Sequence, residues 1–159
     1  MNQVEAAGEL VARLGERGWT LSTAESLTGG ALSSAIVSIP GASKVFLGGF
    51  VAYATPIKHA LLGVDLGLLE RHGPVHADVA LAMATGACRL TGANVSIATT
   101  GVAGPDKQDG QPVGRVHMAI VTPDDHATLT KDFTGNREAI RVSSVETALA
   151  MALSVLDRH

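Results

Sequence analysis

Aromatic residues are scarce in this sequence of 159 residues: they make up 3% of it, while apolar residues as a whole make up 46%. A core must therefore be built from Ala, Val, Leu and Ile. The length suffices for one compact domain, which we expect over residues 1–159. Runs of Lys and Arg are also missing, and the net charge is −3. The composition therefore argues against nucleic acid as a partner.

Cysteine occurs once, at Cys88, which excludes an internal disulfide and fits a reducing compartment. The N-terminal segment carries charges throughout and has no apolar stretch of signal-peptide length. No uninterrupted apolar run approaches the roughly 20 residues that a membrane-spanning helix needs. We therefore expect a soluble, cytoplasmic protein that does not use a membrane as a partner.

Several familiar site motifs are absent as well. The sequence has no Walker A loop and no GxGxxG, which argues against ATP hydrolysis and dinucleotide binding, and it has no GxSxG. His72 and His76 are four residues apart, but Gly73 and Pro74 between them prevent a shared helical face. We therefore expect no metal site and no cofactor.

Hydrophobic periodicity predicts helices and strands that alternate along most of the chain. Helices are expected at residues 4–14, 31–38, 55–62, 65–72, 77–90 and from about 136, and strands at 20–24, 45–53, 95–100, 115–121 and 127–133. The last two strands are predicted to form a hairpin, and the glycines at 48 and 49 indicate a bulge or a close backbone approach. This pattern predicts a three-layer α/β/α domain with a mixed, mostly parallel sheet.

Lys58 is the first candidate for chemistry, because no acidic residue lies between Glu25 and Asp65 to hold its charge. Thr55 and Pro56 fit the N-cap and first position of a helix, which would place Lys58 in the first turn. The helix dipole disfavours a cation there, and burial acts in the same direction. A pKa lowered by roughly 3 units would make Lys58 a general base. The alternative is a surface lysine at a helix start.

Ser43 is the hydroxyl that we pair with Lys58, as the nucleophile of a serine–lysine hydrolase, because it follows a turn that could present it. Tyr53 could donate to the pair or relay between its members. The alternatives are a turn or N-cap serine and a half-buried strand tyrosine. Thr100 and Gly101 end a strand, where open α/β sheets place ligands, so hydroxyl and N–H groups there could polarise a substrate carbonyl.

The turn formed by Glu25, Ser26, Leu27, Thr28, Gly29 and Gly30 lies between a strand and a helix. N–H groups at the start of a helix face an anion, so this turn is the expected phosphate-binding segment. A helix cap made by Ser26 or Thr28 is a compatible alternative. Arg137 and Arg141, four residues apart on the last helix, could form an anion clamp or could cover a solvated face.

Several stretches together resemble the CinA C-terminal domain family, and they follow the order of the family: residues 23–30, 49–53 with Lys58, 100–106, 112–114 and 135–137. The resemblance covers nearly the whole chain, from about Val4 to Leu156. Leu27 stands where members usually carry cysteine, and the loop at 106–110 lacks the usual pair of glycines. The family contains the nicotinamide-nucleotide amidohydrolases.

The resemblance implies that the carboxamide of nicotinamide mononucleotide is hydrolysed to nicotinate mononucleotide and ammonia without a metal. It implies Ser43 as nucleophile, Lys58 as base, assistance from Tyr53 and Thr100, and a nucleotide held by the turn at 25–30. The choice of Ser43 over Ser26 rests on the family. A homo-oligomer is implied too, because homo-oligomers are common in the family. The alternatives are a non-catalytic nucleotide-binding or assembly domain of the same fold, and a phosphoester hydrolase.

Overall fold

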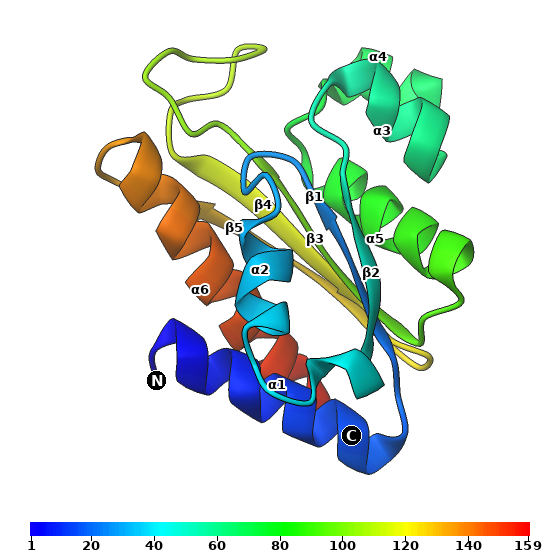
Figure 1. Cartoon of the computed structure of the whole chain (residues 1–159). Helices are drawn as coiled ribbons and strands as arrows, with labels where there is room; N and C mark the ends of the chain where they lie inside the picture. Colours follow the sequence, from blue (N-terminus) through cyan, green and yellow to red (C-terminus); the bar gives the residue numbers. More distant parts are fainter.

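Five strands form one sheet in the order β2-β1-β3-β4-β5, and helices cover both of its faces (Figure 1). The structure is a computed structural model and describes residues 1–159. Its helices are α1 (Gln3–Arg17), α2 (Ala31–Val37), the short 3-10 helix η1 (Ala42–Lys44), α3 (Thr55–Leu62), α4 (Leu66–His72), α5 (Ala77–Thr91) and α6 (Arg137–Leu156). Its strands are β1 (Leu21–Glu25), β2 (Phe46–Val51), β3 (Val95–Gly101), β4 (Arg115–Val121) and β5 (His126–Asp132).

Each helix and strand expected from the sequence is present with bounds close to those expected. Gly18 ends α1 in the left-handed conformation at φ 67°, which glycine adopts without strain. Helix α3 has the expected bounds, but its N-cap is Ala54 and not Thr55, so Pro56 is the second residue of its first turn. The local patterns of the sequence therefore predicted the elements correctly.

The sheet is mixed, as expected, but it is not mostly parallel. Strand β1 pairs in parallel with β2 and with β3, whereas β3 pairs with β4, and β4 with β5, in antiparallel fashion. A parallel return requires a crossover connection, usually a helix, and residues 102–114 between β3 and β4 contain none. The parallel half of the sheet is thus limited to β2, β1 and β3.

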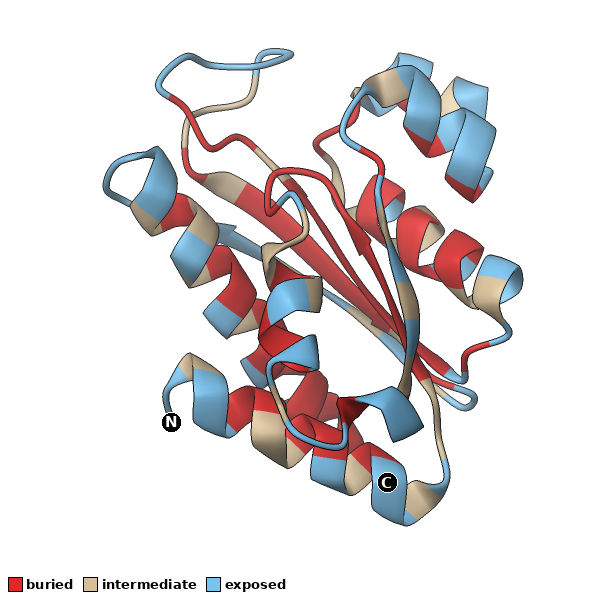
Figure 2. Ribbon diagram, viewed as in Figure 1, coloured by how far each residue is buried: buried red, intermediate tan, exposed pale blue.

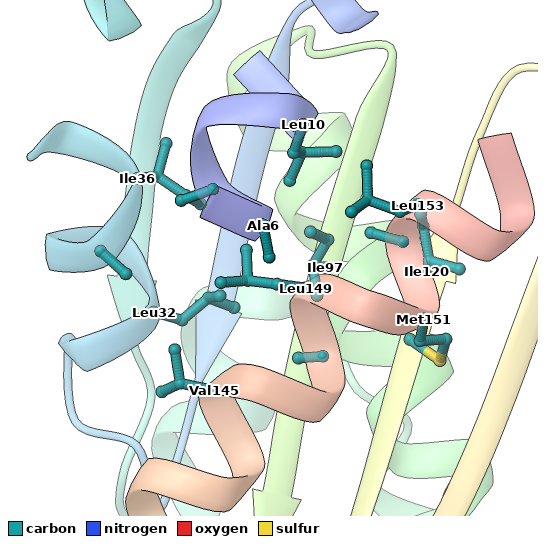
Figure 3. Packing of buried hydrophobic residues seen from close by; sticks show 14 of the residues in the cluster. Ala6, Leu10, Leu32, Ile36, Ile97, Ile120, Val145, Leu149, Met151 and Leu153 are labelled. Atoms are coloured by element: carbon teal, nitrogen blue, oxygen red, sulfur yellow. The ribbon is translucent and has the colours of Figure 1, made fainter. Parts of the chain in front are cut away.

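The two faces of the sheet bury cores of different character (Figure 2). Under α1, α2 and α6 lies a cluster of 27 buried residues rich in Leu, Ile and Val, part of which Figure 3 shows. Under α5 lies a cluster of 12, of which more than half are alanines. No aromatic side chain is fully buried, which confirms the core composition expected from the sequence, although methionines contribute as well. The small side chains let α5 lie close to the sheet.

Helix α6 is the one helix long and apolar enough to cross a membrane, with a mean hydropathy of 1.5. The hydropathy is that of an 18-residue window of α6, and 56% of this window is buried inside the domain. The buried face of α6 packs on the larger core through residues such as Val145, Leu149 and Leu153 (Figure 3). The apolar character of α6 is accounted for by this packing.

The register of the parallel strands brings their carboxyl ends level with one another. Glu25 at the end of β1 pairs with Val51 of β2 on one side and with Thr99 of β3 on the other. The residues that follow each strand therefore meet along one edge, which faces the top of Figure 1. We call this edge of β2, β1 and β3 the carboxyl edge.

Strand β2 lies very close to β1 and α2 because Gly49 has no side chain. A Cβ atom at this position would collide with the hydroxyl oxygens of Thr23 and Ser33. Those two hydroxyls hydrogen-bond to each other at 2.7 Å, and the Ser33 hydroxyl also donates to the Glu25 carboxylate at 2.6 Å. The close approach that the glycines predicted is therefore confirmed at Gly49, whereas Gly48 has open space beside it.

Candidate active site

The carboxyl edge holds a buried lysine in contact with a buried serine. Lys58 reaches back from the first turn of α3, and its side chain is 1% exposed. Its Nζ lies 2.8 Å from the hydroxyl oxygen of Ser26, the first residue after β1. Nζ also donates to the carbonyl oxygens of Ala52 at 2.8 Å and Tyr53 at 3.0 Å. Three oxygens therefore surround the amine, and none of them belongs to a carboxylate.

Burial without a counter-ion makes the charged form of Lys58 costly. Desolvation lowers the pKa of Lys58 from the ordinary 10.5 to about 8. The direction is the one expected from the sequence. A neutral amine has two hydrogens, which match the two carbonyl acceptors, so its lone pair is left for the Ser26 hydroxyl. This arrangement can remove a proton from Ser26.

Ser43 does not meet Lys58, which corrects the expected pair. Ser43 lies in η1, before β2 begins, whereas Lys58 packs beyond the end of β2. Six residues of extended strand separate the two ends by about 20 Å. Ser43 is exposed and makes no side-chain hydrogen bond. Tyr53 therefore cannot relay between Ser43 and Lys58, and Ser26 is the hydroxyl beside the amine.

The expected phosphate site at the start of α2 is already filled by the Glu25 carboxylate. This carboxylate accepts hydrogen bonds from the N–H groups of Gly30, Leu32 and Ser33 at 3.2, 2.8 and 3.0 Å. Glu25 is fully buried, and an internal anion now satisfies the helix dipole. The turn at 25–30 consequently fixes the position of Ser26 and does not offer its helix N-terminus to a phosphate.

Gly29 and Gly30 have a conformational role within this turn. Both have positive φ angles, 57° and 102°. This geometry lets the chain turn from β1 into α2 within a few residues, and other residues would adopt it only with strain. The two glycines therefore place Ser26 on the carboxyl edge, and no contact of theirs points to a ligand.

Arg137 and Arg141 do not form a clamp, because their guanidinium groups hold different parts of the chain. Arg141 donates to the carbonyl oxygens of Leu27 at 2.9 Å and Thr28 at 3.0 Å, so it braces the turn after Ser26. Arg137 donates to the carbonyl oxygen of Gly104 at 2.7 Å and to the Tyr53 hydroxyl at 3.1 Å. Arg137 is exposed and remains available to an anion, whereas Arg141 acts on the turn.

Thr100 has another role than the expected one. Its hydroxyl is buried and donates to the carbonyl oxygen of Pro74 at 2.7 Å, so its proton is not free for a substrate carbonyl. The neighbouring Thr99 hydroxyl pairs with that of Thr28 at 2.7 Å. These two threonines tie the turn after β1 and the segment before α5 to the end of β3.

A small cavity of about 70 Å³ opens beside Ser26, and Gly101, one of the residues predicted to bind substrate, is part of its wall. The lining residues come from the ends of the strands, the loop after β3 and α6: Ser26, Leu27, Tyr53, Gly101, Val102, Ala103, Gly104, Asp106, Gln108 and Arg137. Tyr53 is 58% exposed and stands at the mouth together with Arg137. Three larger cavities, of about 330, 360 and 420 Å³, lie elsewhere, but none of them contains a paired nucleophile and base.

Three buried residues that line this cavity have backbone N–H groups without acceptors. They are Leu27, directly after Ser26, and Ala103 and Gly104 in the loop after β3. Buried N–H groups are rarely left unpaired. Such donors close to a serine hydroxyl are suited to an oxygen atom that becomes negative during a reaction.

The sequence contained a signal for the Ser26–Lys58 contact that the prediction did not use. Ser26 follows a predicted strand, and Lys58 follows the next one after a short connection. Neighbouring parallel strands place their carboxyl ends at one edge of the sheet, and that edge is where open α/β sheets bind ligands. Ser43 precedes its strand and so falls at the other edge. The roles of Arg137 with Tyr53, in contrast, depend on a contact between distant segments that no local pattern shows.

The chain resembles known proteins over almost its whole length. The sequence pattern of the CinA C-terminal domain matches residues 3–156. A CinA-like protein of Frankia casuarinae is 43% identical over 149 residues, which are 94% of this chain and 34% of that protein. A CinA-like protein of a Synechococcus species is 47% identical over 146 residues, which are 90% of this chain and 35% of that protein.

The chain thus spans about a third of the length of the curated relatives it matches. Among solved structures, a competence-damaged protein (CinA) superfamily protein from Klebsiella pneumoniae superposes with a TM-score of 0.96. It is 32% identical in sequence, and the match covers 100% of both chains.

Proposed function

The chain belongs to the CinA C-terminal domain family, and from this premise we propose that it is an amidohydrolase that converts nicotinamide mononucleotide to nicotinate mononucleotide and ammonia. The observation that carries the proposal is the contact of 2.8 Å between the Lys58 amine and the Ser26 hydroxyl. Serine is a weak nucleophile until a base removes its proton, and a lysine with a pKa of about 8 can act as that base.

In the proposed reaction, Ser26 Oγ attacks the carboxamide carbon while its proton moves to Lys58 Nζ. The tetrahedral intermediate collapses as the C–N bond breaks, and the proton on Nζ passes to the leaving nitrogen, which departs as ammonia. A water molecule then gives a proton to Nζ and attacks the acyl-enzyme, which releases the nicotinate product and restores the Ser26 hydroxyl. No step requires a metal or an oxidant.

Negative charge develops on the carbonyl oxygen of the substrate both when Ser26 attacks the amide and when water attacks the acyl-enzyme. Leu27 and Gly104 line the cavity, and we assign their unpaired N–H groups as the donors to this oxygen. In characterised hydrolases, the N–H of the residue after the nucleophile serves in this way. Removal of one donor of this kind costs about 10²–10³-fold in rate. Arg141 contributes indirectly, because it fixes the carbonyl side of the same turn.

The size of the cavity indicates which part of the substrate enters it. Its volume of about 70 Å³ is well below the roughly 300–1,000 Å³ of sites that enclose a whole ligand. The carboxamide and part of the pyridine ring would occupy it, and the ribose phosphate would lie across the open mouth. Arg137 is the cation at that mouth, so it is the residue that we assign to the phosphate.

The test is release of ammonia from nicotinamide mononucleotide by the wild type, Ser26→Ala and Lys58→Met. The proposal predicts turnover by the wild type and its loss in both variants. Release of phosphate in place of ammonia would identify a phosphoester hydrolase. Calorimetric binding of the mononucleotide without release of either product would identify a binding or assembly domain. Far-UV circular dichroism of the variants controls for misfolding.

A further inference from the structure

Two histidine rings stack where α4 ends and α5 begins. The rings of His72 and His76 are parallel to within 13°, and their centroids are 4.0 Å apart. Gly73 and Pro74 do prevent a shared helical face, as the sequence indicated, but the connection that they form folds the second ring back onto the first. The two histidines therefore lie side by side although they share no helical face.

A carboxylate stands beside this pair. The possible ligand atoms of His72, His76 and Asp78 all lie within 4.8 Å of one another. The Nδ1 atom of His76 accepts the backbone N–H of Asp78 at 3.1 Å and so caps α5, which leaves Nε2 of His76 for another partner. The His72 side chain makes no hydrogen bond in the structure, and the residue is exposed.

We propose that His72, His76 and Asp78 form a site for one divalent transition-metal ion of the zinc class. Two imidazole nitrogens and a carboxylate oxygen make a ligand set that such ions accept, with solvent in the remaining position. In a tetrahedral zinc site with bonds of about 2.0–2.1 Å, neighbouring ligand atoms are about 3.3 Å apart. Side-chain rotation would be needed to close the observed spacing to this value, and two of the three side chains are exposed and one is half-buried. Magnesium and calcium prefer sets of oxygen ligands and do not suit a pair of imidazoles.

The position of the three residues gives the ion a structural consequence. His72 is the last residue of α4, and His76 is the N-cap of α5, so one ion would clip the two helices together. Between the two helices, the carbonyl oxygen of Pro74 accepts a hydrogen bond from the Thr100 hydroxyl at the end of β3. A Cβ atom on Gly73 would lie 3.5 Å from the side chain of Asp109, in the loop that also lines the cavity beside Ser26. The proposed ion would therefore hold the connection that supports this side of the carboxyl edge.

The experiment is calorimetric titration of the wild type with Zn²⁺, together with the visible absorption of bound Co²⁺, in a buffer that does not chelate metals. The wild type is expected to bind one equivalent at this site and to show the absorption of Co²⁺ bound by nitrogen ligands. His72→Gln and His76→Asn are expected to weaken binding by at least about tenfold and to abolish that spectrum. The His76→Asn variant keeps an N-cap side chain, so α5 retains its start.

His126→Gln is the matched control, because His126 is an exposed histidine on β5, outside the cluster. It is expected to bind metal as the wild type does. A second readout is the melting temperature, which Zn²⁺ should raise in the wild type and in His126→Gln but not in the two cluster variants. The proposal is overturned if the wild type takes up no stoichiometric metal, or if His72→Gln and His76→Asn bind it as tightly as the control.

Discussion

The two edges of the parallel strands differ in ways that decide which of them can do chemistry. At the carboxyl edge, Ser26 is buried, touches a lysine with a lowered pKa and has unpaired N–H groups beside it. At the opposite edge, Ser43 is exposed and has no partner. The cavity beside Ser43 is nevertheless the larger, at about 420 Å³ against about 70 Å³. Cavity size is therefore a poorer guide here than the chemistry of the lining groups.

The contrast follows from how strands end. At the carboxyl edge the chain leaves each parallel strand with carbonyl groups, such as those of Ala52 and Tyr53, which can hold an amine in place. Helix α3 then turns Lys58 back over this edge, where no carboxylate offsets its charge. The opposite edge has no charged group held in this manner near Ser43. Within one domain, one serine thus lies beside a base and the other has no partner that could activate it.

The largest effect should come from replacing each of the two serines by alanine in turn. Ser26→Ala is expected to lower kcat/KM for nicotinamide mononucleotide by about 10³-fold or more, because the nucleophile is lost. Ser43→Ala should leave kcat/KM within about twofold of the wild type, because it touches nothing at the carboxyl edge. Ammonia release measures both variants. An inactive Ser43→Ala variant together with an active Ser26→Ala variant would contradict the assignment of the chemistry to the carboxyl edge.

The second effect concerns the stability of the carboxyl edge as a function of pH. Burial lowers the pKa of Lys58 to about 8, whereas the unfolded chain titrates at 10.5. Between these values the unfolded state binds the proton and the folded state does not, so stability from this group rises with pH in that window. Below about pH 8 the cost is constant, at about 3 kcal/mol from 1.36 kcal/mol per pH unit.

The free energy of unfolding of the wild type should therefore rise relative to that of Lys58→Met by about 3 kcal/mol from pH 8 to pH 10.5. Urea unfolding at a series of pH values gives this difference. Lys44→Met serves as the control for removal of a lysine, because Lys44 is exposed beside Ser43 at the opposite edge. Parallel pH curves for the wild type and Lys58→Met would show that Lys58 keeps its proton in the folded state.

The third effect concerns the packing of β2, the strand that runs between the two edges. Gly49→Ala would push a methyl group into the hydroxyls of Thr23 and Ser33, next to the Glu25 carboxylate. We expect a loss of about 2 kcal/mol in the free energy of unfolding, as for other overpacked sites. Gly48→Ala, one position earlier in an open environment, should change it by about 0.5 kcal/mol or less. Equal losses for the two variants in urea unfolding would contradict the close packing at Gly49.

The smallest effect concerns the mouth of the cavity. Arg137→Gln should raise KM for nicotinamide mononucleotide about tenfold, or about 1.4 kcal/mol, because the cation assigned to the phosphate is lost. KM for nicotinamide riboside, which has no phosphate, should change much less. Steady-state kinetics with both substrates gives the comparison. An equal rise for the two substrates would mean that Arg137 acts by holding Tyr53 and Gly104 and not by binding phosphate.

The order and type of the elements could be predicted from the sequence because each depends on local patterns, such as the Gly18 stop of α1. The buried state and lowered pKa of Lys58 could also be predicted, since the absence of nearby acids is visible along the chain. The partner of Lys58 could not be fixed locally, because it depends on which strand ends meet. The hydrogen bonds from the start of α2 to the Glu25 carboxylate could not be predicted either, because they depend on the conformation of the turn that follows β1.

The central claim is that the amine beside Ser26 loses its proton far more easily than an ordinary lysine does. Nuclear magnetic resonance of protein labelled at lysine Cε and Nζ measures this directly, and Lys58→Met assigns the signal. The account predicts one lysine signal that titrates with a midpoint near 8 and is missing from the variant. If no lysine signal titrates below about 10, at most about one amine in a thousand is neutral at pH 7, and the claim that Lys58 activates Ser26 is contradicted.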